Sequence, residues 1–406
     1  MAVNLREKKE NELLSIDGTQ VFIGQAGVKK AHHDDLTLIV LKPNSNIGAV
    51  FTQNRFCAAP VHIAKQHLTY ENGIRGLVIN TGNANAGSGE QGRVDALAVC
   101  RAVAEQLDCA VEQVLPFSTG VILEPLPVQK IISALPSVHP AHWNDAARAI
   151  MTTDTVPKAG SREGKIGENH QVRATGIAKG AGMIHPNMAT MLAFIATDAK
   201  VSQPILQMLT QEVADMSFNS ITVDGDTSTN DSFVIVATGK NEQSEIDNIA
   251  DPRYEQLKEL ICNLALELAQ AIIRDGEGAT KFITVHVKNA SSREDARKVA
   301  YAIAHSPLVK TAFYASDPNL GRLLCAIGYA GVESLDPDEV HMYLGDVLVV
   351  EKGGRAASYT EEEGQRVMNE AEITVTVDLQ SGREEAKVYT CDFSKEYVTI
   401  NADYRS

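Results

Sequence analysis

Apolar and polar residues alternate along the chain in blocks that predict both strands and helices. The run LTLIVL at residues 36–41 is almost entirely apolar and has the length of a buried central strand. Residues 159–178 predict a strand hairpin, and residues 127–151 predict a helix. In residues 205–216 and 252–274, apolar side chains recur every three or four positions, the spacing of a helix with one buried face. This mixture indicates an α/β protein.

The pattern changes most sharply in residues 179–200. The first half holds four residues that interrupt regular structure, namely Gly180, Gly182, Pro186 and Asn187. An apolar run follows at residues 190–197, so Thr190 stands where a loop gives way to a strand. Cleavage of the bond after Ala189 would give Thr190 a free α-amine with a pKa of about 7.7–8.0, which could take the proton of its own hydroxyl. From these residues alone, a threonine at such a position is more often an ordinary strand residue.

The last third of the chain predicts a separate α+β unit. The long helix before it is expected to end in a left-handed residue at Gly276. Ser291 and Glu294 form a capping-box pattern for the next helix. Later apolar segments predict strands, and the last two strands are expected to form a hairpin around Ser381 and Gly382.

Length and composition narrow the class of protein further. A chain of 406 residues is long enough for about two or three domains. Its net charge of −15 argues against nucleic acid or an anionic membrane as a partner. No segment approaches the ~20 consecutive apolar residues of a membrane span. The six cysteines form no CxxC pair, and no ligand pattern predicts a metal, so reduced thiols and a cytoplasmic location are expected.

Residues 187–192 (NMATML) resemble the self-cleaving segment of the ornithine acetyltransferase family, also called the glutamate N-acetyltransferases. Further segments match in the same order, including VFTQNRFCAAPV at 50–61, GLVINTGNANAGSGEQG at 76–92 and SDPNLGR at 316–322. The resemblance covers about residues 18–406. It implies the layered α/β sandwich that this family shares with self-cleaving aminopeptidases, together with a smaller C-terminal α+β domain.

The resemblance implies that Thr190 cleaves its own chain at the bond between Ala189 and Thr190. Residues 1–189 would then become an α chain. Residues 190–288 would begin the β chain and complete the main domain, and residues 289–406 would form the C-terminal domain. The two chains are expected to stay together as an α2β2 heterotetramer.

The resemblance also implies a set of site residues. Thr190 would be the nucleophile, and Thr119 and Gly120 would form the oxyanion hole, to which a hydroxyl and a backbone N–H are suited. One implied substrate contact falls among the threonines at residues 152–155. It is assigned to Thr153, and a threonine one position away stays an alternative. A lysine suits the carboxylate of an amino acid. The implied substrate contacts, besides Thr190, are Thr153, Lys179, Glu277, Asn401 and Ser406.

Two further patterns concern loops. Leu123, three residues after the oxyanion pair, stands where members of the family often have glycine. Gly87, Gly89 and Gly92 spell GxGxxG before a predicted helix, which would suit a phosphate at the helix N-terminus. The loop at residues 80–86 is too long for a dinucleotide fingerprint, so a glycine-rich turn is the favoured interpretation.

The implied reaction is a ping-pong transfer of acetyl from N-acetylornithine to glutamate through an acyl-enzyme, a step of arginine biosynthesis. No bound cofactor is implied. Acetyl-CoA would be a second acetyl donor if the protein is bifunctional and also an amino-acid N-acetyltransferase. Two alternatives stay open. A self-cleaving amidase or aminopeptidase of the same fold would use water as acceptor, and a non-catalytic amino-acid-binding or phosphate-binding protein would keep an uncut chain.

Overall fold

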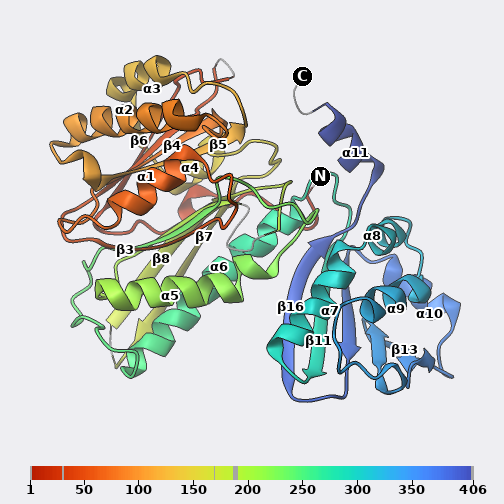
Figure 1. The fold of residues 1–406 in the computed structure, drawn as a ribbon. Coiled ribbons are helices and arrows are strands. Elements are labelled where there is room, and N and C mark those ends of the chain that lie inside the picture. Colours follow the sequence, from red (N-terminus) through yellow and green to blue (C-terminus); the bar gives the residue numbers. More distant parts are fainter. Residues whose placement is uncertain (1, 30–31, 169, 186–190, 404–406) are drawn as a thin grey trace. The chain divides into compact units, whose positions relative to one another are not determined.

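The structure is a computed structural model that describes residues 2–29, 32–168, 170–185 and 191–403. The chain forms two compact units (Figure 1). The larger unit comprises Glu7–Asn219 and Asp226–Ile272, and the smaller unit comprises Met1–Arg6, Ser220–Gly225 and Ile273–Ser406. The domain limits predicted at residues 189 and 288 rest on the family resemblance and stay predictions.

Among the described residues, the larger unit holds two five-stranded sheets. The first has the order β5-β4-β2-β1-β6, with β1 (Thr19–Gly24), β2 (Leu36–Leu41), β4 (Gly76–Asn83), β5 (Val114–Val121) and β6 (His139–Ala141). The second has the order β3-β10-β9-β8-β7, with β3 (Asn46–Phe51), β7 (Lys158–Ile166), β8 (His170–Lys179), β9 (Leu192–Thr197) and β10 (Ser232–Ala237). The central strand predicted at 36–41 and the hairpin predicted at 159–178 are confirmed as β2 and as the β7–β8 pair.

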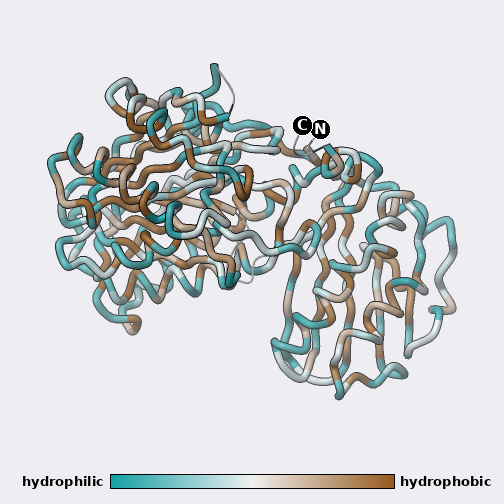
Figure 2. The backbone as a smooth tube through the Cα atoms, turned by 45° about the horizontal axis from the view of Figure 1, so that its top comes forward, coloured by the Kyte–Doolittle hydropathy of each residue, from teal (hydrophilic) through white to brown (hydrophobic). Residues whose placement is uncertain are grey.

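One hydrophobic core joins the two sheets. It contains residues of β2, β4 and β5 from the first sheet and of β8, β9 and β10 from the second. Phe117 of β5 and Phe194 of β9 meet edge to face across this core, with ring centroids 5.0 Å apart. Figure 2 shows brown, hydrophobic stretches gathered inside each unit and teal, hydrophilic stretches mainly at outer bends. The predicted sandwich of stacked sheets is confirmed.

Helices pack on the outer faces of both sheets. Helices α1 (Ala59–His67), α2 (Gly89–Leu107) and α3 (Val128–Ala134) share a second core with the first sheet. Helix α6 (Pro252–Arg274) lies on the second sheet, where Gly160 and Gly164 of β7 make room for Leu264 and Leu260. Helix α5 (Gln203–Met216) covers the edge strand β3, since Gln203 Nε2 donates a 2.6 Å hydrogen bond to the Ile47 carbonyl.

The helix predicted at residues 127–151 is interrupted. The chain forms α3, then the short strand β6, and then α4 (Trp143–Ala149). Pro136 and Pro140 lie between the two helices. Because a proline inside a helix removes a hydrogen bond and clashes with the preceding turn, one continuous helix cannot form here.

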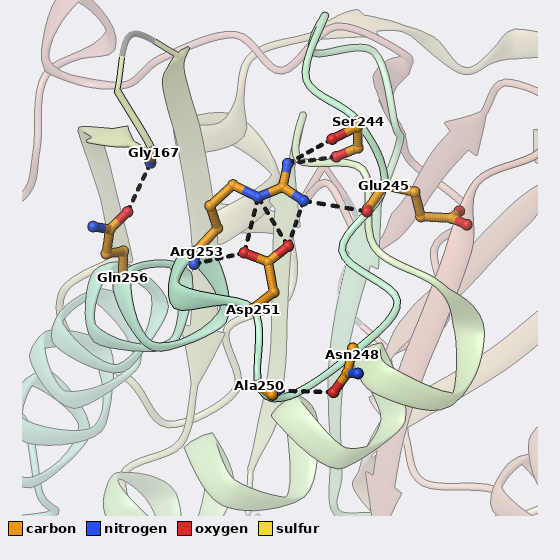
Figure 3. A network of polar contacts seen from close by, with 8 residues as sticks. All are labelled: Gly167, Ser244, Glu245, Asn248, Ala250, Asp251, Arg253 and Gln256. Carbon is orange, nitrogen blue, oxygen red and sulfur yellow. Dashed lines mark hydrogen bonds and ion pairs between the residues drawn. The ribbon is translucent and has the colours of Figure 1, made fainter.

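Polar contacts fix the start of α6 (Figure 3). Asp251 Oδ1 accepts a 2.9 Å hydrogen bond from the Arg253 backbone N–H, as an N-cap does. The Arg253 side chain donates to both Asp251 oxygens, and these hydrogen bonds lower the pKa of Asp251. It also donates to the Ser244 carbonyl at 2.9 Å. Gln256 Oε1 accepts from Gly167 N–H at 2.7 Å. The loop before α6 and the β7–β8 turn are thereby tied to its first turns.

In the described part of the smaller unit, a six-stranded sheet has the order β14-β13-β12-β15-β11-β16. Its strands are β11 (Phe282–Ala290), β12 (His341–Leu344), β13 (Val347–Glu351), β14 (Gly354–Arg355), β15 (Glu372–Asp378) and β16 (Glu384–Cys391). The unit's helices are α7 (Arg293–His305), α8 (Pro307–Tyr314), α9 (Leu320–Gly328), α10 (Glu361–Met368) and α11 (Lys395–Ala402).

The hairpin predicted around Ser381 and Gly382 is wrong, because β11 lies between β15 and β16. Strand β11 pairs in parallel with β15 and antiparallel with β16, so both of its edges are hydrogen-bonded. The Gly382 N–H donates to the Asn289 carbonyl at 2.9 Å, which leads the connection around the end of β11. The predicted cap of α7 is also displaced by one residue: Ser292, and not Ser291, accepts from Asp295 N–H at 3.0 Å.

Candidate active site

Thr119 and Gly120 lie near the end of β5, beside Thr81 and Gly82 of the parallel strand β4. Thr119 is buried, and Gly120 has a φ of +133°, a conformation that favours glycine. A β-carbon on Gly120 would lie 2.2 Å from the Gly82 carbonyl carbon. The position therefore requires glycine both for its φ and for the lack of space. The pairing of β4 and β5 is irregular at this point, where the register shifts between Gly82 and Asn83.

A buried amide network holds this strand end in place. Asn230 Nδ2 donates to the Ala84 carbonyl at 2.6 Å and to the Ser118 carbonyl at 2.9 Å. Ser118 Oγ donates to Asn80 Oδ1 at 2.6 Å. Because these groups are buried and paired, they fix the backbone directly before the candidate oxyanion hole. The sequence pattern did not predict this structural role for Asn230 or Asn80. A polar residue within or next to a buried strand was the signal that could have revealed it.

Leu123 has a φ of +68° and an exposed side chain. Its N–H donates to the Ala86 carbonyl at 2.9 Å, and its side chain lies against Gly87, where an added β-carbon would be 2.7 Å from Leu123 Cδ2. Leucine is strained in this backbone conformation, and glycine would adopt it without strain. The leucine keeps the turn but carries that strain.

Lys179 ends β8, opposite Leu192 of β9, and is buried. A second buried lysine, Lys158, lies close to the same loop, and Asp154 links the two segments. Asp154 Oδ1 accepts from Lys158 Nζ at 2.6 Å and from Gly180 N–H at 2.7 Å, and Oδ2 accepts from Thr152 N–H at 3.0 Å. The structure thus joins the threonine loop, which contains the half-buried Thr153, to the end of β8. Sequence reasoning missed Asp154 and Lys158, although their i, i+4 spacing is visible in the sequence.

Two lysine side chains act on the carboxylate of Asp154. Burial by itself would raise the pKa of Asp154, but the positive charges of Lys158 and Lys179 and the hydrogen bonds to the carboxylate hold that pKa well below its usual range. The side chains of Lys158 and Asp154 are both 0% exposed. Lys179 is therefore a buried ammonium group close to Asp154, and a lysine at such a position suits an anionic group such as a substrate carboxylate.

The strand after the predicted cleavage point is fully buried and lies between β8 and β10. The Ser232 N–H donates to the Met191 carbonyl at 3.0 Å, which extends the pairing to the residue before β9. The predicted nucleophile Thr190 and its neighbour Ala189 lie outside the described residues, so their roles stay predictions.

In the smaller unit, the structure brings together two predicted site residues that are 124 positions apart in the sequence. Asn401 Nδ2 donates to Glu277 Oε2 at 2.7 Å. Glu277 is 6% exposed, which excludes an ordinary solvated loop position. Ser406, the third predicted contact of this unit, lies outside the described residues.

The left-handed residue after α6 is Gly278 and not Gly276. Gly278 has a φ of +68°, and a β-carbon there would lie 2.5 Å from Ser394 Oγ and 2.6 Å from the Tyr397 nitrogen. A β-carbon on Gly276 would instead lie 3.1 Å from the Cys391 sulfur. Both glycines therefore allow close packing, and Gly278 allows the loop of Glu277 to touch the first turn of α11.

Among the described residues, no three His, Cys, Asp or Glu side chains gather as metal ligands would. No described helix has the length and apolar character needed to cross a membrane.

Two stacked sheets with outer helices define an α/β sandwich. A glycine with positive φ at the end of β5 and buried lysines at β7 and β8 give it a candidate acyl-transfer site. The chain belongs to the ArgJ family, whose family model matches residues 20–406. It is 73% identical over 406 residues to the arginine biosynthesis bifunctional protein ArgJ of Neisseria meningitidis serogroup A, with 100% of both chains covered. It is 72% identical, with the same coverage, to the protein of that name from Neisseria gonorrhoeae.

A solved structure supports the fold. The crystal structure of the arginine biosynthesis bifunctional protein ArgJ from Bacillus halodurans matches with a TM-score of 0.50 and 37% sequence identity. The match covers 52% of this chain and 97% of that chain. The expected family and fold class are confirmed.

Proposed function

We propose that this protein is an acetyltransferase of arginine biosynthesis, which transfers acetyl from N-acetylornithine to glutamate and also acetylates glutamate from acetyl-CoA. The observation that carries this proposal is the full-length identity of 73% to a relative named as a bifunctional arginine biosynthesis protein. The buried Lys179 beside Asp154 supports it, because a lysine ammonium group suits the carboxylate that both amino-acid substrates carry.

Maturation would precede catalysis. Thr190 Oγ attacks the carbonyl carbon of Ala189, the peptide C–N bond breaks, and an ester on Thr190 forms while its nitrogen becomes an amine. Water then hydrolyses the ester. The products are a carboxylate on Ala189 and a Thr190 with a free α-amine, the group that can act as base for its own hydroxyl.

Acetyl transfer would follow in two steps. Thr190 Oγ attacks the acetyl carbonyl of N-acetylornithine while the α-amine takes its proton, and the Thr119 hydroxyl and Gly120 N–H stabilise the oxyanion. The amide C–N bond breaks, and the proton passes to the leaving ornithine. The amine of glutamate then attacks the acetyl ester, which releases Thr190 and gives N-acetylglutamate.

Substrate binding would divide between two groups of residues. Lys179 receives the carboxylate. Asp154 accepts a hydrogen bond from the N–H of the next residue, Gly180, and Thr153 lies on the adjoining loop. Glu277 and Asn401 receive the amino group, and Ser406 contributes from the chain end. We also propose that no cofactor stays bound, that the two cleaved chains assemble as α2β2, and that the protein acts in the cytoplasm.

Intact-protein mass spectrometry before and after brief incubation with N-acetylornithine tests the proposal. The expected result is two fragments split between Ala189 and Thr190, with one acetyl group on the second. Thr190→Ala is the control and should remain uncut and unlabelled. A Thr190→Ala protein that still acetylates glutamate would overturn the nucleophile assignment.

Product analysis separates the alternatives that share the nucleophile. The purified protein is given N-acetylornithine with and without glutamate, and N-acetylglutamate and acetate are measured. N-acetylglutamate as the main product supports the acetyltransferase. Acetate released at the same rate with or without glutamate would identify an amidase, and an uncut chain that forms no product would identify a binding protein.

A further inference from the structure

Helix α8 of the smaller unit buries a lysine that the proposed reaction does not use. Lys310 is 1% exposed. Its Nζ donates to Thr390 Oγ1 at 2.7 Å and to the Cys391 carbonyl, and lies 4.6 Å from the centroid of the Phe393 ring. An ammonium group so deeply buried is costly unless its hydrogen bonds and charge are compensated. Thr390 and Cys391 are the last two residues of β16, and Phe393 lies between β16 and α11.

Asp392, between Cys391 and Phe393, binds the loop that carries Glu277. Its Oδ1 accepts from the N–H groups of Thr280 and Lys281, each at 2.8 Å, and its Oδ2 accepts from Thr280 Oγ1 at 2.6 Å. Burial lowers the pKa of Lys310, and Cys391 and Asp392 oppose that shift. The buried cation and the buried carboxylate therefore fasten one short stretch of backbone to α8 on one side and to the Glu277 loop on the other.

Helix α11, which carries Asn401 (dark blue in Figure 1), has little core of its own. Of the residues described in α11, none is buried. Its fixed points are at its start: Ser394 Oγ accepts from Tyr397 N–H at 3.3 Å, and the Phe393 and Tyr397 rings stack with centroids 4.8 Å apart. Tyr397 Oη also donates to Asp224 Oδ2 at 3.2 Å. The direction of α11 is consequently set by residues 390–397 and not by burial of its own surface.

We propose that Lys310 is a positioning residue that, through Phe393 and the first turn of α11, holds Asn401 against Glu277 and thereby sets the affinity for the amino-acid substrate. This inference rests on the proposed function, in which Glu277 and Asn401 receive the substrate amino group. Asn401 occupies Oε2 of Glu277, so it orients the carboxylate and directs Oε1 to the ammonium group of the substrate. Without the Lys310 side-chain contacts, the segment that leads into α11 is held less firmly to α8, and Asn401 leaves this geometry.

Lys310→Met tests the role, because methionine fills the same space without the charge or the hydrogen bonds. We expect the KM for N-acetylornithine to rise about tenfold with kcat changed less than about twofold, since the reacting groups are untouched. Cleavage between residues 189 and 190 reports that the variant has folded. An unchanged KM in a cleaved Lys310→Met protein would overturn the proposal.

Lys281→Met is the matched control. Lys281 is a buried lysine of the same unit, 7% exposed, but its Nζ donates to the carbonyls of Met368 and Glu370 at the end of α10. Lys281→Met therefore removes a buried cation but none of the contacts that hold α11. We expect Lys281→Met to leave the KM unchanged. An equal rise in KM in both variants would mean that Lys310 contributes only to the stability of the unit, which would overturn its positioning role.

A double-mutant cycle separates this inference from the proposed function. Asn401→Ala alone should raise the KM, and adding Lys310→Met should raise it no further, because Lys310 acts through Asn401. Effects that multiply in the double variant would overturn the positioning role. An unchanged KM in Asn401→Ala would instead remove Asn401 from the substrate contacts, which is a failure of the proposed function.

If Lys310→Met does not yield a cleaved protein, Phe393→Leu replaces it as the test variant. It removes the ring beneath the ammonium and the stack on Tyr397 but keeps both hydrogen bonds of Lys310. Hydrogen exchange of the amides of residues 395–402 should quicken in Phe393→Leu, together with a rise in KM. Unchanged exchange and an unchanged KM would overturn the anchoring role of this contact.

Discussion

The backbone of Gly120 passes so close to Gly82 that a β-carbon on Gly120 would lie 2.2 Å from the Gly82 carbonyl carbon. Even the smallest side chain must therefore push β5 away from β4 and displace the N–H at the candidate oxyanion hole. Gly120→Ala is expected to lower kcat about 10²–10³-fold, the loss typical when one oxyanion donor is removed. Steady-state kinetics with N-acetylornithine and glutamate measure it.

Gly89→Ala is the control for this variant. Gly89 also has a positive φ, +58°, but no atom lies within 4 Å of an added β-carbon. Gly89→Ala should lower the free energy of unfolding by about 1 kcal/mol without affecting kcat. A Gly120→Ala enzyme as active as Gly89→Ala would contradict the placement of the oxyanion hole.

Asp154→Asn should destabilise the larger unit by about 3–5 kcal/mol, because it leaves the Lys158 ammonium buried without its carboxylate. Urea unfolding measures the change. Asp251→Asn is the matched control, since the Asp251–Arg253 pair is partly exposed and should contribute about 1 kcal/mol or less. The double variant Asp154→Asn/Lys158→Met should regain part of the loss, and no recovery would argue against a charge effect.

The Arg274–Glu372 pair of the smaller unit predicts a pH dependence. Arg274 donates to both Glu372 oxygens at 2.7 and 2.8 Å, and these hydrogen bonds lower the pKa of Glu372 to about 2. A carboxylate with a lowered folded-state pKa stabilises the protein above its unfolded pKa of about 4.3, and this contribution is lost as the pH falls toward about 2. Because Glu372 is partly exposed, the contribution is no more than about 1 kcal/mol.

Urea midpoints of the wild type and of Glu372→Gln at pH values from 3 to 7 check this dependence. The difference between them should be constant above about pH 5 and should shrink below it. A difference that grows on acidification would contradict the assigned sign.

Leu123→Gly should stabilise the larger unit by up to about 1 kcal/mol, because glycine adopts the φ of +68° without strain. Thermal unfolding measures the gain. Leu123→Ala separates the two possible causes: it removes the exposed side chain but keeps a β-carbon, so it should bring no gain. Equal stabilisation by both substitutions would point to the side chain and away from backbone strain.

Local patterns predicted those elements whose own residues carry a clear apolar pattern. The apolar run at residues 36–41 is β2, and the helical spacing at 252–274 is α6. The failures involve distant partners. Nothing in residues 372–391 reveals that β11 will enter between β15 and β16, because that choice depends on which strand edges remain to be paired.

The predictions for the candidate site rest on the family resemblance and not on local patterns. The family resemblance supplied Thr119, Gly120, Glu277 and Asn401, and the structure shows the close approach at Gly120 and the contact between Glu277 and Asn401. The supporting residues escaped prediction because their partners are remote in sequence: Asp154 meets Gly180, and Asn230 meets Ser118. Their chemistry becomes visible only when the chain is folded.

The place of β9 between β8 and β10 has a consequence for the proposed cleavage at residue 190. The strand that would begin the second fragment is hydrogen-bonded on one side to a strand of the first fragment, and Phe194 packs on Phe117 of that fragment. The two pieces could part only by unfolding. Separately expressed as two polypeptides, residues 1–189 and 190–406 would constitute a natural split protein whose halves regain activity only by folding together.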